Sequence, residues 1–335
     1  MEIKRNKSIE VYGHRGCRSY APENSIPAYK TALSVGVNWV DIDIGLTKDG
    51  KIVAYHDLWI NPDFTSKDGK FLADSNEEFI LQMIKKDSKL VQSYLLKNIT
   101  FEKLQEYDIG ILNPNSRYAS YFPEQVKIKD TRIPSFQQVI DCVDKISDRN
   151  VNYQIEIKND PLNPIFSFSS KEIVSILYEE LKRNNLIERV EVQAFDWELL
   201  YQLQSLDNNI RTAYLIAYNE IDMNNPDNFK GCGIWCGGEL LKKYNNSMPY
   251  MVKSLGGSCY EPEDVILSQR DLDKAHELGL KVAVWSWPEH SGQAFDRKLI
   301  DKLITWGVDG ITTDDPKALN SMLFERGFAI PRNFR

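Results

Sequence analysis

Short apolar runs alternate along the chain with segments whose apolar residues recur at helical spacing. Strands are expected at residues 9–14, 38–44, 51–56, 152–157, 189–195, 211–216, 232–236, 257–260, 281–286 and 308–312. Helices are expected near 24–35, 170–184, 196–205, 268–279 and 295–306, with another from about Pro134. The sequence KDG predicts a tight turn before 51–56, which makes that run an excursion from the main sheet. About eight parallel strands remain.

Strands that alternate with helices in this way predict an α/β fold, the TIM (β/α)8 barrel. The length of 335 residues suits two ordinary domains or one large barrel with an insertion. A barrel of about 250 residues leaves roughly 75–85 residues over, and these fall at about 58–132, where loops and short helical pieces show no strand alternation. We therefore expect one domain over 1–335, with a small insertion after the second barrel strand that lies over the barrel mouth.

The aromatic residues of this insertion have two possible uses. Tyr118, Tyr121 and Phe122 lie close together in the sequence and suit either the lining of a pocket or the packing of the insertion onto the barrel. Packing is the favoured use, because large aromatic side chains bury more apolar surface than most.

Composition narrows the classes of function. The chain is 42% hydrophobic, which is enough for a sizeable core, and its net charge of −7 leaves no broad basic surface for nucleic acid. The lack of long uncharged apolar runs predicts no membrane span, and the first residues lack a signal-peptide core, so a cytoplasmic protein is expected. The five cysteines are odd in number and scattered, so reduced thiols are expected. Cys232 and Cys236 form C-x3-C without a second Cys or His pair nearby, which favours two strand residues over a zinc site.

Two of the four histidines follow apolar strands. His14 comes after IEVYG and His56 after KIVAY, and a parallel barrel assembles its catalytic groups at the carboxyl ends of its strands. Both are therefore candidates for the general acid and base, although a histidine at a strand end can also be structural. His276 lies on an amphipathic helix and is expected at the surface or in a satisfied core position, and His290 lies in a loop.

Carboxylates gather on two of the expected strands. Asp41 and Asp43 are two residues apart, so both point to one face, and Glu156 and Lys158 repeat this spacing on a later strand. Buried acids need compensation, and a hard divalent cation with oxygen ligands supplies it, although Lys158 can also neutralise Glu156. Three carboxylates with a metal, a lysine and Arg15 suit an anionic phosphate group, and so favour phosphoryl chemistry.

Together with these residues, a series of motifs resembles the glycerophosphodiester phosphodiesterase family. The motifs are GHRG at 13–16, PEN at 22–24, DID with LTKDG within 41–50, HD at 56–57, IEIK at 155–158, VWSW at 284–287 and VDGITTDDP at 308–316. They occur in the right order from about residue 9 to 316, and the joint occurrence of HRG, PEN, TKDG and HD is highly specific.

The resemblance implies a role for each matching position. His14 and His56 correspond to the acid/base pair, Arg15 and Lys158 to phosphate ligands, and Asp41, Asp43 and Glu156 to metal ligands. Glu23 supports the loop that carries His14, and Trp285 packs against the glycerol side of the substrate. Family members use Mg²⁺ or Ca²⁺. The chain departs from the pattern at Asp41, where Glu is common, so the ligand is one methylene shorter and the identity of the metal stays open.

The implied activity is metal-dependent hydrolysis of a small-molecule glycerophosphodiester to glycerol 3-phosphate and an alcohol. One histidine deprotonates water or the glycerol 2-hydroxyl, and the other protonates the leaving alcohol. The sequence leaves open which histidine does which, the alcohol moiety and the oligomeric state. A second reading is a lysophospholipase D-like activity, with an apolar groove formed by Trp59, Tyr118, Phe122, Tyr214 and Tyr260. A third is a phosphate-binding barrel without catalysis.

Overall fold

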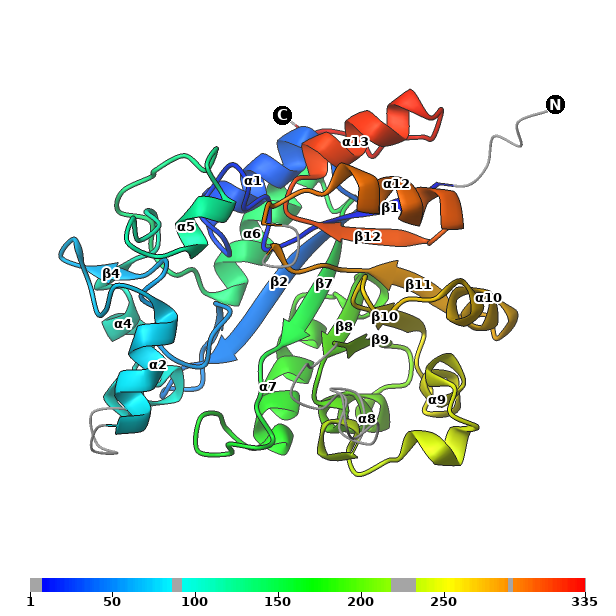
Figure 1. Cartoon of the computed structure of the whole chain (residues 1–335). Coiled ribbons are helices and arrows are strands. Elements are labelled where there is room, and N and C mark those ends of the chain that lie inside the picture. Colours follow the sequence, from blue (N-terminus) through cyan, green and yellow to red (C-terminus); the bar gives the residue numbers. More distant parts are fainter. Residues whose placement is uncertain (1–7, 86–91, 218–232, 289–291, 335) are drawn as a thin grey trace.

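The fold is a closed barrel of eight parallel strands, in a computed structural model that describes residues 8–85, 92–217, 233–288 and 292–334 (Figure 1). The strands are β1 (Glu10–Gly13), β2 (Trp39–Leu46), β7 (Asn152–Ile157), β8 (Val190–Ala194), β9 (Arg211–Ile216), β10 (Cys259–Pro262), β11 (Lys281–Val284) and β12 (Gly310–Thr313). Each pairs in parallel with its neighbours in the order β1-β12-β11-β10-β9-β8-β7-β2, and β2 pairs back with β1. The predicted TIM barrel is confirmed.

Helices surround the barrel and bury the outward faces of its strands. They are α1 (Ile26–Val35), α6 (Phe136–Ser147), α7 (Ser170–Arg183), α8 (Trp197–Leu206), α9 (Met248–Ser254), α10 (Gln269–Glu277), α12 (Arg297–Trp306) and α13 (Pro316–Glu325). α6 and α7 each begin with a capping box, formed by Ser135 with Gln138 and by Ser169 with Glu172, which satisfies amide groups that a helix start leaves free. Apolar residues of strands and helices share one large core.

The interior of the barrel is packed rather than open. Tyr12 and Trp39 stack with their ring centroids 5.3 Å apart, and they form a buried cluster with three small residues of β9, β10 and β11. Lys281 lies over both rings and forms an ion pair of 2.8 Å with Glu191. This cluster packs the interior of the barrel, and the cavity that holds the candidate site lies at the carboxyl ends of the strands.

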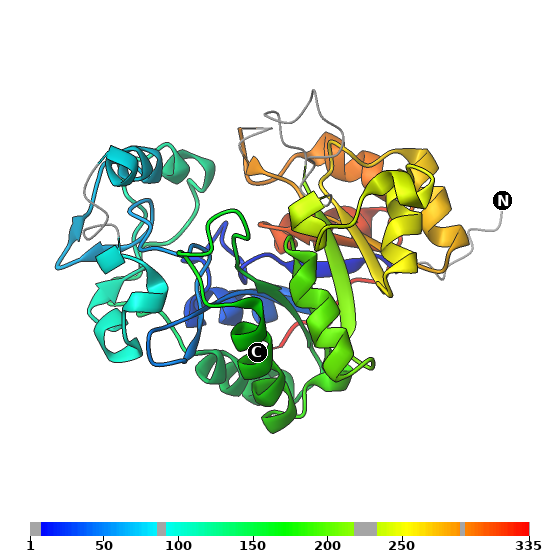
Figure 2. The same ribbon diagram turned by 90° about the horizontal axis from the view of Figure 1, so that it is seen from below.

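The expected excursion after β2 is present. β3 (Ile52–Ala54) pairs antiparallel with the end of β2 through the turn at 48–50, and it adds a ninth, non-barrel strand to the sheet. The insertion that follows lies to one side of the barrel in both views (Figures 1 and 2). Its elements are β4 (Ser66–Lys67), β5 (Lys70–Phe71), α2 (Asn76–Lys85), a 3-10 helix (Leu96–Asn98), α4 (Phe101–Leu104), β6 (Tyr107–Asp108) and α5 (Tyr118–Tyr121).

The insertion departs from the sequence expectation in one respect. β4, β5 and β6 form a small antiparallel sheet in a segment that was expected to hold only loops and short helical pieces. Each of these strands has two residues, which is too short for alternation of period two to be visible. Apolar residues of the segment, among them Phe64 and Leu104, form a second small core together with Val53 of β3 and Tyr55.

The strand expected at 232–236 is wrong. Cys232 lies outside the described residues, and Gly233–Cys236 is a 3-10 helix. β9 pairs directly with β10 over four residues, so the closed barrel has no position for another strand there. Within the described residues, Cys17, Cys142 and Cys259 carry free thiols. Among all the residues that the structure describes, no helix has both the length and the apolar character needed to cross a bilayer.

Candidate active site

His14 lies at the end of β1, on a tight turn that aims its ring into the barrel mouth. The turn is closed by a 3.0 Å hydrogen bond from the Gly16 amide to the Gly13 carbonyl. Gly16 has a φ of +88°, and a Cβ there would come within 2.8 Å of Ala28 on α1, so only glycine fits. The sequence GHRG therefore places His14 and Arg15 side by side at the opening of the barrel.

The ring of His14 is held by Asp314, which follows β12. The distance from His14 Nδ1 to Asp314 Oδ1 is 2.6 Å. Arg18 donates two hydrogen bonds to the same carboxylate, from Nε at 2.5 Å and from Nη2 at 3.0 Å. Burial, followed by the charge of Arg18, lowers the pKa of His14 from 6.5 to about 4. The imidazole is therefore neutral near pH 7 and holds the protonation state of a base.

His56 follows β3 and is paired with its neighbour in the sequence. His56 Nδ1 lies 3.3 Å from Asp57 Oδ1, and Asn61 donates a 2.8 Å hydrogen bond to the other oxygen. Burial alone would raise the pKa of Asp57, but the nearby His56 and these hydrogen bonds lower it. Asp57 is therefore ionised, and its carboxylate lies beside Nδ1 of the His56 ring.

The three acids of the predicted metal site share the inner face of neighbouring strands. Asp43 and Glu156 are register partners between β2 and β7, and Gln193 of β8 continues the row next to Glu156. Asp41 lies one step below, where its Oδ1 accepts from Gln193 Nε2 at 2.8 Å and its Oδ2 from the Arg15 amide at 3.0 Å. Strands in a sheet lie about 4.8 Å apart, so this row brings oxygen atoms close together.

Two cations compensate these acids. Lys158 Nζ is 2.9 Å from Asp43 Oδ1 and also contacts Glu156 Oε1. Arg15 Nε is 3.0 Å from Asp43 Oδ2, and Arg15 Nη1 donates to Glu23 Oε1 at 2.7 Å. The PEN motif thus supplies the carboxylate that holds Arg15 in place.

The pKa values of the three acids follow from this arrangement. Burial raises the pKa of Asp43, but Lys158 and Arg15 outweigh it and bring the pKa well below its usual value. Burial and the charge of Asp43 raise the pKa of Asp41. Burial also raises the pKa of Glu156, while Lys158 opposes the change. The two cations thus stabilise the charge of Asp43 most strongly.

An aromatic wall completes the opening. Trp285 donates from its indole Nε1 to the Glu261 carbonyl at 3.2 Å, and its ring lies edge-on to those of Phe195 and Trp287. A cavity of about 30 Å³ lies between this wall and the polar residues. It is lined by His14, Arg15, His56, Glu156, Lys158, Gln193, Phe195, Leu215, Glu261, Trp285, Ser286, Trp287 and Thr312.

The structure brings together the nine residues singled out in the sequence. Six of them line the cavity itself, and the other three, Glu23, Asp41 and Asp43, contact Arg15 from behind. Sequence reasoning gave no role to Arg18, Asp314, Gln193 or Glu261. Asp314 had a usable signal, because it follows an apolar strand as His14 and His56 do. Gln193 and Glu261 had none, since single polar residues on strands are common.

His276 and two of the tyrosines proposed for an apolar groove lie away from the cavity. His276 is at the surface on α10 and pairs with Asp309 at 2.8 Å, and His290 lies outside the described residues. Tyr214 and Tyr260 are only 0% and 2% exposed, in the core between strands and helices. The groove expected from these two tyrosines is therefore wrong, because they belong to the outward-facing phase of β9 and β10.

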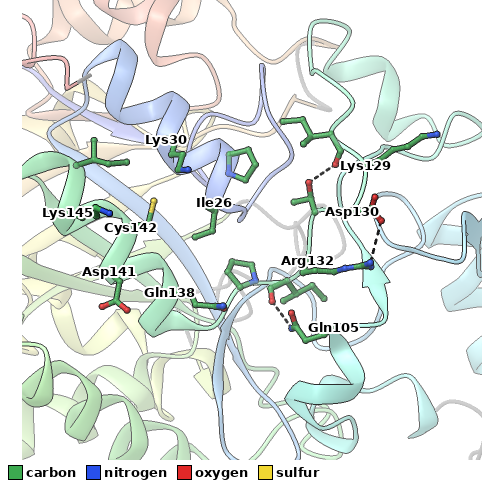
Figure 3. A pocket seen from close by; sticks show the side chains of 16 residues that line it. Ile26, Lys30, Gln105, Lys129, Asp130, Arg132, Gln138, Asp141, Cys142 and Lys145 are labelled. Carbon is green, nitrogen blue, oxygen red and sulfur yellow. Dashed lines mark hydrogen bonds and ion pairs between the residues drawn. The ribbon is translucent and has the colours of Figure 1, made fainter.

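A much larger cavity, of about 780 Å³, lies outside the barrel. It opens between α1, α6 and residues 128–134, where Lys30, Cys142 and Lys145 lie near one another (Figure 3). None of the nine residues lines it. The small cavity at the barrel mouth is the better candidate for an active site, because it gathers paired histidines, carboxylates and cations with perturbed pKa values.

A closed barrel of eight parallel strands with helices between them belongs to the class of TIM-barrel proteins, whose active sites lie at the carboxyl ends of the strands. The model of the glycerophosphoryl diester phosphodiesterase family matches residues 14–318, and the chain therefore belongs to this family.

Individual relatives agree with this assignment. The chain is 25% identical over 320 residues to a glycerophosphodiester phosphodiesterase of Caldanaerobacter subterraneus, covering 95% of this chain and 98% of the relative. It is also 25% identical to one of Bacillus subtilis, over 92% of this chain and 84% of that protein. A crystal structure from Silicibacter pomeroyi, provisionally named a glycerophosphoryl diester phosphodiesterase, has a TM-score of 0.78 at 24% identity, over 96% and 95% of the two chains.

Proposed function

We propose that this chain hydrolyses glycerophosphodiesters to glycerol 3-phosphate and an alcohol in a metal-dependent reaction. The observation that carries the proposal is the meeting of two histidines, each with a carboxylate at Nδ1, with Arg15 and Lys158 at one cavity. In support, a phosphodiesterase of Oleispira antarctica with a similar fold, at a TM-score of 0.63 and 18% identity over 95% of this chain and 97% of that chain, was solved in complex with the product sn-glycerol-3-phosphate.

The two histidines would divide the acid and base work. His14 is neutral, and because Asp314 accepts from its Nδ1, its Nε2 is free to take a proton from the nucleophile. His56, with ionised Asp57 behind it, would give a proton to the leaving alcohol. The nucleophile is water in direct hydrolysis, or the glycerol 2-hydroxyl in a route through a cyclic phosphate.

Arg15 and Lys158 would bind the phosphate. Their side chains have a pKa above the usual value, because Glu23, Asp43 and Glu156 outweigh the effect of burial. Both therefore stay charged in a buried site, where charge stabilises a phosphoryl transition state more strongly than it does in water. Trp285 and its aromatic neighbours would pack against the carbon skeleton of glycerol.

Asp41, Asp43 and Glu156 fit a hard divalent ion, Mg²⁺ or Ca²⁺, by the chemistry of their donors. All offer carboxylate oxygens on one face, and Gln193 adds a buried Oε1 that accepts no hydrogen bond. Within the described residues, no three acidic, His or Cys side chains converge as a ready-made cluster, since Lys158 lies between Asp43 and Glu156. When bound, the ion would supply positive charge beside the phosphate oxygens.

The test measures release of glycerol phosphate from glycerophosphocholine, with EDTA and then with added Mg²⁺ or Ca²⁺. We expect metal-dependent release, and a fall of about 10²- to 10⁴-fold in kcat for His14→Ala and for His56→Ala. His276→Ala is the matched control, because that histidine pairs with Asp309 far from the cavity.

Three results would contradict the proposal in different ways. Wild-type rates in both active-site variants would remove the histidines from the mechanism. Absence of release with either metal, while lysophosphatidylcholine is cleaved, would assign the lysolipid activity instead. Binding of glycerophosphocholine without cleavage of either compound would indicate a phosphate-binding protein.

A further inference from the structure

Tyr118 of the insertion reaches the loop that carries His14 and Arg15. It begins the short helix α5, and its hydroxyl donates to Glu23 Oε2 and accepts from Arg18 Nη1 at 2.8 Å. Neighbouring residues hold the two segments together, with Gln125 Nε2 donating to the Arg18 carbonyl at 2.8 Å and the Val126 amide to the Tyr20 carbonyl at 3.0 Å. The contact is thus a built part of the structure.

The phenol joins two arms that end at different parts of the active site. One arm runs from Glu23 Oε1 to Arg15 Nη1 at 2.7 Å, and so to the phosphate-binding side. The other runs from Arg18 to Asp314, and from there to His14 Nδ1 at 2.6 Å. Without Tyr118 the arms barely meet, since Arg18 Nη1 lies 3.9 Å from Glu23 Oε2.

The link lies in an environment where hydrogen bonds matter. Arg15, Arg18, Glu23 and Asp314 are all at most 4% exposed, so unpaired charges there would be costly. The two guanidinium groups repel each other, and their geometry depends on the acceptors around them. Burial raises the pKa of Tyr118, so its hydroxyl keeps the proton that it donates to Glu23.

We infer that Tyr118 is a positioning residue, through which the insertion aligns both Arg15 and His14 for the reaction. The inference rests on the proposed function. The alternative is a purely structural role, since the Tyr118 ring packs on Phe64 and Phe122 and Arg18 lies over the Phe122 ring. The hydroxyl and the ring can be separated experimentally.

Tyr118→Phe removes the hydroxyl and keeps the ring. Tyr121→Phe is the matched control, because Tyr121 lies on the same helix, is buried and, in the described part of the chain, has no hydrogen bond to its hydroxyl. The assay is glycerophosphocholine hydrolysis, with the inhibition constant of inorganic phosphate as a measure of binding and the melting temperature as a measure of folding.

We expect Tyr118→Phe to lower kcat/KM by about 10- to 100-fold, the loss expected for a hydrogen bond to charged groups. Because the phenol touches both arms, kcat should fall, and both KM and the phosphate inhibition constant should rise. Tyr121→Phe should leave all three unchanged. Tyr118→Phe should raise KM less in a Glu23→Gln background than in the wild type, because Glu23→Gln already weakens the contact between Glu23 and Arg15.

Other results would contradict the inference or the proposed function on which it rests. If the wild type releases no glycerol phosphate, the proposed function fails before the inference is reached. If the wild type is active and Tyr118→Phe equals Tyr121→Phe, the inference is wrong. A lower melting temperature and lower kcat with unchanged KM and phosphate inhibition would assign Tyr118 a structural role only. Should Tyr118→Phe not fold, Glu23→Gln alone must raise KM and the phosphate inhibition constant for the inference to hold.

Discussion

The neutral, buried state of His14 makes the fold sensitive to acid in a way that a single substitution can isolate. The side chain of His14 is 16% exposed, and its pKa falls from 6.5 to about 4 on folding. Between these two values the unfolded chain binds a proton that the folded chain does not. Stability therefore decreases as the pH falls from about 6.5 to about 4, and stays at the lower level below that.

The size of the effect follows from the shift. A difference of about 2.5 pH units corresponds to about 3 kcal/mol, since each unit is worth about 1.4 kcal/mol. His14→Gln removes the titrating ring and keeps an amide that can donate to Asp314. In this variant the part of the acid sensitivity that belongs to His14 should disappear, while the carboxylates titrate as before.

The assay is urea unfolding at several pH values from 4 to 7.5 in EDTA, followed by fluorescence and by circular dichroism. We expect the free energy of unfolding of the wild type to fall about 3 kcal/mol further over this range than that of His14→Gln. If the two optical transitions differ, the comparison is restricted to the first one. Parallel pH profiles of the two proteins would refute the reasoning.

Two other substitutions test the surroundings of the same ring. Asp314→Asn should lower kcat by about 10²-fold or more with little change in KM, because an amide no longer fixes the tautomer of His14. Steady-state kinetics measure both constants, and an unchanged kcat would contradict this prediction. Gly16→Ala should lower both the melting temperature and the activity, because residue 16 has a φ of +88° and the added Cβ would collide with the α1 backbone. Thermal unfolding measures the melting temperature. A stable, active variant would show that the turn can adapt.

The fold was predictable from the sequence because each barrel strand is a short apolar run followed by a helix. The exceptions had local causes. The run at 232–236 is rich in small residues and has no place beside a strand once β9 and β10 pair directly. Neighbouring two-residue strands of the insertion share only two register pairs and leave no pattern in the sequence.

The candidate site was predictable where residues two apart on a strand point to the same face, as for Asp41 with Asp43 and Glu156 with Lys158. It was not predictable where residues far apart in the chain meet. Arg18 and Asp314 are 296 residues apart, and only closure of the barrel joins them. The face of the strand on which a side chain lies was also predicted wrongly for Tyr214 and Tyr260. Both face the helices, although their strands line the site.

The pairing of β1 with β12 joins the first and last barrel strands. His14 and Asp314 lie directly after these two strands, so the His14–Asp314 pair forms only when β12 closes the barrel against β1. During synthesis the chain emerges from its amino end, so His14 lacks the carboxylate that holds its ring until β12 and Asp314 have left the ribosome. A barrel that lacks β12 is therefore expected to be inactive for a geometric reason, and the appearance of phosphodiesterase activity would report closure of the barrel.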